Sequence, residues 1–180
     1  MDRPVELVPL LCIKCSTPVP AGVDERAWVC ANCGQGLVLD EITGLKPLDI
    51  YYSALIPSHQ TGRPFWMAEG KVTLKRETYG SSGKSGREGE EFWSVPRKFF
   101  VPAFSCSLED MLRLGMDYLV RPPDLNPGPP VSFQPVTLST EDFPAAAEFV
   151  VVALEAGRKD KIRKLDFNLE LSTPCLWILP

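Results

Sequence analysis

The alternation of apolar and polar residues along this chain predicts several β-strands. It is most regular over residues 164–172, where Leu165, Phe167, Leu169 and Leu171 share one face and polar residues occupy the other. A similar alternation runs over 70–79. Apolar and aromatic residues also fill 48–57 and 91–104, and the prolines inside the second of these runs are typical of an edge or bulged strand.

The segment 175–180, CLWILP, is as apolar as the interior of a domain. Burying each of its large side chains contributes about 1.5–3 kcal/mol, so some surface should cover them. We expect a last strand in the protein's own sheet, beside 164–172, with residues 172–174 as the turn between them. The alternative is a tail that lies against a partner protein.

Two helices are predicted between the strands. Ser107 has the side chain of an N-cap, and Gly115 is expected near the end of the helix that follows. The second helix begins after Ser139 or Thr140 and stops at Gly157. Its acidic residues recur every seven positions and form one thin polar stripe (Glu141, Glu148 and Glu155), so most of its circumference should be buried against a sheet.

Two segments have the composition of loops. Residues 79–90 are rich in glycine and serine, which predicts a mobile hairpin tip with no helix starting at Ser85. Its Gly-Lys-Ser is not a phosphate-binding loop, because the required first glycine is replaced by Thr78. Residues 121–135 contain six prolines and predict an extended crossover.

Composition narrows the class of protein. The chain has 180 residues, of which 44% are hydrophobic and 23% charged, as in ordinary globular proteins. The net charge of −4 lacks the basic excess that is typical of duplex-binding domains. No apolar run is long enough for a transmembrane helix, and a signal peptide is not expected, so we expect a cytoplasmic protein.

The cysteine spacing is the most informative motif. Cys12-Ile-Lys-Cys15 and Cys30-Ala-Asn-Cys33 are separated by fourteen residues. Two such turns supply four thiolates in a tetrahedron, as a closed structural zinc site requires. We therefore predict one structural Zn²⁺ held by these four cysteines, with iron or disulfide bonds as the alternatives.

This stretch resembles the zinc-ribbon superfamily over about residues 10–40, through the four cysteines, Gly34 and the aromatic Trp28. The resemblance implies a small hairpin-based metal domain and leaves function open, because zinc ribbons bind nucleic acid, bind protein or cap another domain. Ser16 stands where the doubled Cys-x-x-Cys-Gly of rubredoxins has glycine, which argues against an iron electron-transfer site.

Few other residues are candidates for catalysis or ligand binding. His59 is the only histidine, and Cys106 and Cys175 lie in sequences that show nothing to activate a thiol. A basic run follows the second helix, and with Lys71, Lys75 and Arg76 it is a candidate surface for an anionic ligand (Arg158, Lys159, Lys161, Arg163 and Lys164). Its simpler role is to complement the dipole at a helix C-terminus.

These observations predict an α+β protein. Residues 1–42 form a zinc ribbon, and residues 43–180 form a mostly antiparallel, β-rich domain with two helices. Because no nucleophile–base pair is visible, we expect a non-enzymatic interaction module, an accessory or adaptor subunit that docks another protein. The alternative is a nucleic-acid-binding protein that uses the ribbon and the basic segment 158–164. The sequence does not indicate the oligomeric state.

Overall fold

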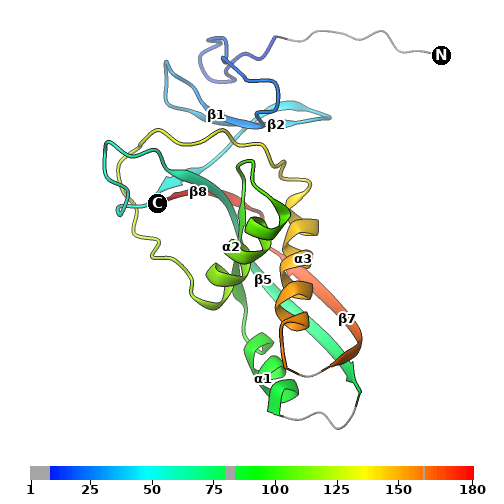
Figure 1. The fold of residues 1–180 in the computed structure, drawn as a ribbon. Helices are drawn as coiled ribbons and strands as arrows, with labels where there is room; N and C mark the ends of the chain where they lie inside the picture. Colours follow the sequence, from blue (N-terminus) through cyan, green and yellow to red (C-terminus); the bar gives the residue numbers. More distant parts are fainter. Residues whose placement is uncertain (1–8, 80–83, 160) are drawn as a thin grey trace, which may run out of the picture.

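The computed structural model describes residues 9–79, 84–159 and 161–180. Over these ranges the chain forms two sheets and three helices, with the cysteine-rich ribbon at one end of the molecule (Figure 1). The predicted α+β class is confirmed. A third helix was not predicted.

The smaller sheet extends beyond the predicted ribbon of residues 1–42 and has the antiparallel order β1 (Ala27–Val29), β2 (Gly36–Asp40) and β3 (Gly44–Pro47). Each face of this sheet packs into a different hydrophobic cluster. Trp28 and Leu37 pack beside the cysteines, whereas Ala27 and Val38 face the core of the rest of the chain. Buried residues therefore follow one another without alternation in these strands. The division at residue 42 stays a prediction.

The larger sheet is built around β5 (Arg63–Thr78), a strand of sixteen residues. On one side β5 pairs with β6 (Arg97–Pro102), and on the other it pairs in succession with β8 (Cys175–Leu179) and β7 (Ile162–Leu171). β4 (Ile50–Tyr52) adds a parallel pairing to β8. The predicted strand over 70–79 and the alternation over 164–172 are both confirmed, since their apolar positions face the core.

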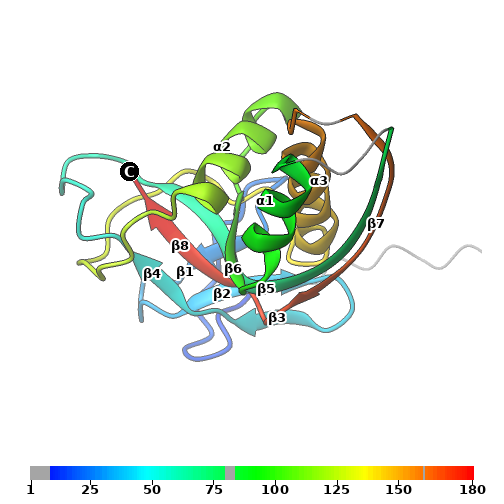
Figure 2. The same cartoon turned by 90° about the horizontal axis from the view of Figure 1, so that it is seen from below.

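The C-terminal strand lies in the protein's own sheet, as expected, but not beside 164–172. β7 and β8 run in the same direction along β5, one after the other (Figure 2). Ser172 continues the pairing instead of turning, because its amide donates to the carbonyl of Glu69 and its hydroxyl accepts from the Glu69 amide. β8 is consequently an interior strand between β4 and β5.

The prediction of a loop over 79–90 was wrong from residue 84 onward; residues 80–83 lie outside the described ranges. α1 (Lys84–Trp93) is a helix that packs beside β5. Trp93 at its end is 5% exposed, and Gly89 lies close to Arg76, Glu155 and Arg158. Tertiary contacts thus stabilise a helix that its glycine content disfavours. The predicted strand over 91–104 is correspondingly shortened to β6, which does lie at an edge.

α2 (Leu108–Val120) begins as predicted, with the Ser107 hydroxyl accepting from the Asp110 amide. It does not end near Gly115. That glycine is buried, and a Cβ added to it would lie 2.6 Å from Cγ2 of Val150. The glycine therefore permits close packing of α2 on the next helix.

α3 (Phe143–Ala156) is preceded by Asp142, whose amide donates to the Ser139 hydroxyl. The helix packs against the larger sheet, with Ala147, Val150 and Val151 in the main core. Glu148 is exposed, as the predicted polar stripe requires, but the stripe does not continue to Glu155, and the rest of the helix circumference is not buried as predicted. Glu155 is completely buried, whereas Phe149 and Val152 are 58% and 42% exposed.

The main core lies between the larger sheet and α3 and includes Trp66, Phe99 and Trp93. A second cluster on the other face of the sheet joins Phe65, Phe100 and Trp177. The helices of the described ranges are all too short or too polar to span a bilayer.

Candidate metal centre

The two Cys-x-x-Cys turns have the same backbone structure. In the first, the Cys12 amide donates to Thr17 and the Ser16 amide donates to Cys12; in the second, Cys30 and Gly34 make the equivalent bonds to Gln35 and Cys30. The four bonds are 2.8–2.9 Å long.

The residue after each second cysteine also takes the same conformation. Gly34 has φ 71° and Ser16 has φ 58°, in the left-handed region. Ser16 thus replaces the expected glycine without changing the turn, although a non-glycine residue is uncommon there. Ser16 therefore differs from the Cys-x-x-Cys-Gly pattern in residue type but keeps its backbone conformation.

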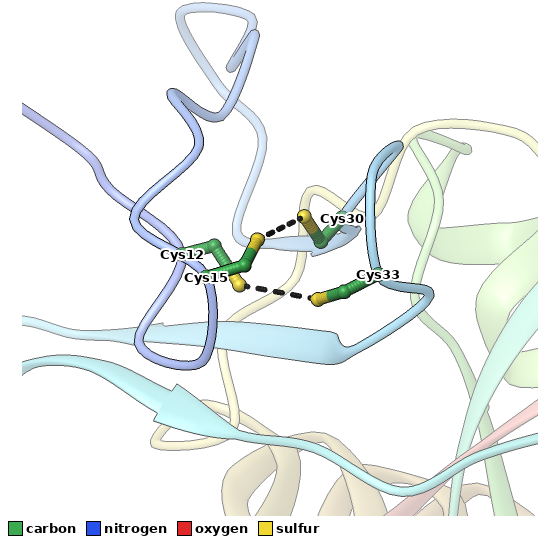
Figure 3. A group of neighbouring side chains, drawn as sticks. All are labelled: Cys12, Cys15, Cys30 and Cys33. Carbon is green, nitrogen blue, oxygen red and sulfur yellow. Dashed lines mark hydrogen bonds between the residues drawn. The ribbon is translucent and has the colours of Figure 1, made fainter.

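The four cysteine side chains converge on one point between the turns (Figure 3). Sγ of Cys12 is 3.7 Å from Sγ of Cys33, and Sγ of Cys15 is 3.5 Å from Sγ of Cys30. All four sulfurs lie within 4.8 Å of one another. Zn–S bonds of about 2.3 Å place the sulfurs of a regular tetrahedron about 3.8 Å apart. The cluster therefore fits one metal ion of this size.

The pKa values of two of these thiols are shifted in opposite directions. The hydroxyl of Thr17, 3.3 Å from Sγ of Cys15, and the Thr17 amide lower the pKa of Cys15 to about 5. At Cys33 a hydrogen bond from Gln35 lowers the pKa, but desolvation and the three neighbouring sulfurs outweigh it and raise the pKa to about 12. A bound cation removes this conflict, because it stabilises all four thiolates together.

Apolar side chains surround the sulfurs. Val19, Trp28 and Leu37 are each less than a tenth exposed and pack against the cysteines. The Trp28 indole donates to Oε2 of Glu25 at 2.8 Å, so its polar atom is satisfied while the ring covers the cluster. Cys12 and Cys30 are buried beneath these side chains, whereas Cys15 and Cys33 remain partly exposed.

A second polar cluster was missed in the sequence. Glu155 of α3 is buried, with Nε of Arg76 2.9 Å from Oε2 and Nε of Arg158 2.8 Å from Oε1. The Trp93 indole also donates to Oε1. These contacts join α1, β5 and α3. Arg158 is three residues from Glu155, but Arg76 and Trp93 are far from it along the chain, and Glu155 fitted a solvated stripe equally well.

The other candidate chemical residues are His59, Cys106 and Cys175. His59 is exposed in a turn. Burial and the nearby Asp110 raise the pKa of Cys106, and burial followed by Asp49 raises the pKa of Cys175. Both thiols are therefore less nucleophilic at neutral pH than an ordinary cysteine.

The basic residues predicted to form an anionic contact surface are largely neutralised. Lys71 lies opposite Glu170 and Lys75 opposite Asp166 in the pairing of β5 with β7. Arg76 and Arg158 contact Glu155, and Lys164 pairs with Asp166. The exposed remainder is Lys159, Lys161 and Arg163. This segment lies near the end of the molecule opposite the ribbon (Figure 1).

A groove of about 470 Å³ lies between the ribbon and the extended segment 130–135. Trp28 of β1, Tyr52 of β4 and Phe133 supply its aromatic lining, and the rings of Tyr52 and Phe133 are 6.3 Å apart. Prolines form much of the rest (Pro20, Pro130 and Pro135). Glu25 is the one charged residue in the lining.

Comparison with protein-family models, curated proteins and solved structures gives no match to this chain. The functional argument therefore depends on the geometry of the molecule itself.

Proposed function

We propose that this protein is a non-enzymatic zinc-ribbon module that docks another protein. One Zn²⁺ held by Cys12, Cys15, Cys30 and Cys33 has a structural role in this proposal. The set of four thiolates supports zinc, as do the sulfur separations of 3.5 and 3.7 Å and the apolar surroundings. Because thiols in this arrangement must stay reduced to hold the metal, we also propose a cytoplasmic location.

The groove beside the ribbon is the observation that carries the docking proposal. Among the described residues, its lining combines aromatic rings and prolines with one carboxylate and no cationic side chain. Such a surface suits an apolar segment of a protein, since aromatic residues are enriched where proteins meet. It does not suit a phosphate backbone, which requires positive charge.

Nucleic-acid binding is the second candidate, and Lys159, Lys161 and Arg163 favour it because they are exposed. Two observations weigh against it. The neighbouring cations face carboxylates within the chain, and the ribbon lies far from this basic segment along the molecule. A single duplex would therefore have to contact the ribbon and the basic segment at opposite ends of the protein.

Affinity purification of the tagged protein from its native source tests the docking proposal. Ser132 lies exposed in the lining of the groove, so Ser132→Glu should place a charge there without disturbing the core. We expect a stoichiometric partner with the wild type and its loss with Ser132→Glu. Thr173→Glu, at another exposed position, is the matched control and should retain the partner.

Nucleic-acid binding, the second candidate function, predicts a different result. Retention on DNA or RNA that weakens with salt, and that is lost when Lys159 and Lys161 are changed to glutamate, would favour it over protein docking. A partner that survives Ser132→Glu would show that the groove is not the docking site.

A further inference from the structure

β7 forms an open edge of the larger sheet. It is ten residues long, contains no proline, and pairs only with β5 among the described residues. Figure 2 shows it at the periphery of the molecule. On its inner face Phe167, Leu169 and Leu171 pack against the core but are only partly buried, and Leu165 is also partly buried. A regular edge strand of this length offers its unpaired backbone groups to another strand.

An apolar stripe of α3 adjoins this edge. Phe149 and Val152 are 58% and 42% exposed, and Ala145 and Ala156 continue the stripe at spacings of four, three and four residues. Val152 and Ala156 share a hollow of about 580 Å³ with Ile162 and Leu165 of β7. A solvent-facing helix side normally carries polar residues, so this stripe indicates a covered surface.

The charges of β7 complement those of a second β7. If two copies pair antiparallel about Phe167, Lys164 lies opposite Glu170 of the second copy, and Glu170 opposite its Lys164. Asp166 then lies opposite Asn168, so no like charges meet on the outer face. The inner face brings Leu165 opposite Leu169, an apolar pair.

Neighbouring registers that keep each residue on its face are less favourable. Pairing about Asp166 sets that carboxylate opposite its own copy. Pairing about Asn168 sets Asp166 opposite Glu170 twice. Like charges placed directly opposite each other destabilise a strand pair. Of these three registers, the charges favour pairing about Phe167. Pairing about Leu165 also sets Lys164 opposite Asp166, but it aligns fewer residues of β7.

We propose that the protein forms a homodimer in which β7 pairs antiparallel with β7 of a second copy, centred on Phe167. The interface is isologous: each copy contributes the same strand and the same α3 stripe. The larger sheet becomes continuous across the two-fold axis, and the dimer covers the half-buried inner face of β7. This inference does not depend on the groove beside the ribbon.

A charge exchange tests the proposal on the full-length protein by sedimentation equilibrium. Lys164→Glu and Glu170→Lys each convert two attractive pairs of the dimer into two repulsive ones. Each should weaken the dimer by roughly tenfold or more. Mixing the two variants should restore a heterodimer. Positions 164 and 170 are both acidic in the first variant and both basic in the second, so opposite charges meet at each pair.

The mixture contains the same two variants as the separate samples. If it associates more strongly than either variant alone, the substitutions act on contacts between chains and not on the folding of each chain. Lys98→Glu is the matched control, because it changes the charge of an exposed side chain on β6, which lies on the other side of β5 from the β7 edge. It should leave the dimer intact. A wild-type protein that is monomeric up to about 100 μM, or variants whose mixture associates no better than either alone, would overturn the proposal.

Discussion

The indole nitrogen of Trp93 donates a hydrogen bond of 2.8 Å to Oε1 of Glu155, with both side chains buried. This bond joins the end of α1 to the end of α3. Arg76 and Arg158 contact the same carboxylate, so a residue that looked like part of a solvated helix face holds three elements together. The network stabilises the end of the molecule opposite the ribbon.

Glu155→Gln should therefore destabilise the protein strongly. Removing the charge weakens the contacts of this buried carboxylate with Arg76 and Arg158, and breaking a buried ion pair costs about 3–5 kcal/mol. Trp93→Phe removes one charge-assisted hydrogen bond and should cost about 2 kcal/mol. Urea denaturation of both single variants and the double variant measures their coupling. Glu148→Gln on the exposed side of α3 is the control, and a similar loss there would contradict the assignment.

Gly115→Ala should destabilise the protein, although alanine is favoured over glycine in an exposed helix by about 1 kcal/mol. The added Cβ would lie 2.6 Å from Cγ2 of Val150, and such overpacking costs about 1–3 kcal/mol. Val150→Ala removes the obstructing methyl groups. In that background Gly115→Ala should be neutral or stabilising in thermal unfolding. An equal loss in both backgrounds would show that the contact is not the cause.

Cys30→Ser should abolish metal binding and unfold the ribbon, because ligand binding supplies its folding free energy. Metal analysis should give about one zinc per chain for the wild type and close to none for the variant. Cys106→Ser, which changes an exposed cysteine outside the cluster, should retain the metal. Finding iron, or no metal in carefully prepared wild-type protein, would refute the zinc assignment.

Zinc affinity should rise with pH between about 6 and 8. In the metal-free cluster the pKa of Cys33 is raised to about 12, so this thiol is protonated throughout that range. Zinc must displace its proton, and a step that releases protons is favoured as their concentration falls. Competition with a chelator of known pH dependence measures the slope. An affinity that is flat over this range would show that all four thiols are already deprotonated.

Ile178→Ala should destabilise the fold by about 2–5 kcal/mol, since it removes a large buried side chain from an interior strand. Ile178 is completely buried, and β8 lies between β4 and β5. Leu55→Ala, at a side chain that is 61% exposed, should change the unfolding midpoint little. If the two substitutions had similar effects, the C-terminal strand would not be integral to the sheet.

Local patterns were sufficient for the elements whose residues interact over short distances. The Cys-x-x-Cys spacing places two sulfurs on one tight turn, and the alternation over 164–172 reflects one buried face of a strand. Ser107 caps α2 through a residue three positions away. In each case the determining contacts lie within a few residues or within a single element, where the order of side chains specifies them.

Tertiary structure decided the features whose partners are distant in the chain. α1 forms despite its glycines because Trp93 reaches Glu155, and Gly115 continues a helix because Val150 requires the space. Ser172 extends the pairing with β5 instead of turning, since the Glu69 backbone offers both a donor and an acceptor. Glu155 is buried because two guanidinium groups meet it there. Local propensities differ by only about 1 kcal/mol per residue, so such long-range contacts outweigh them.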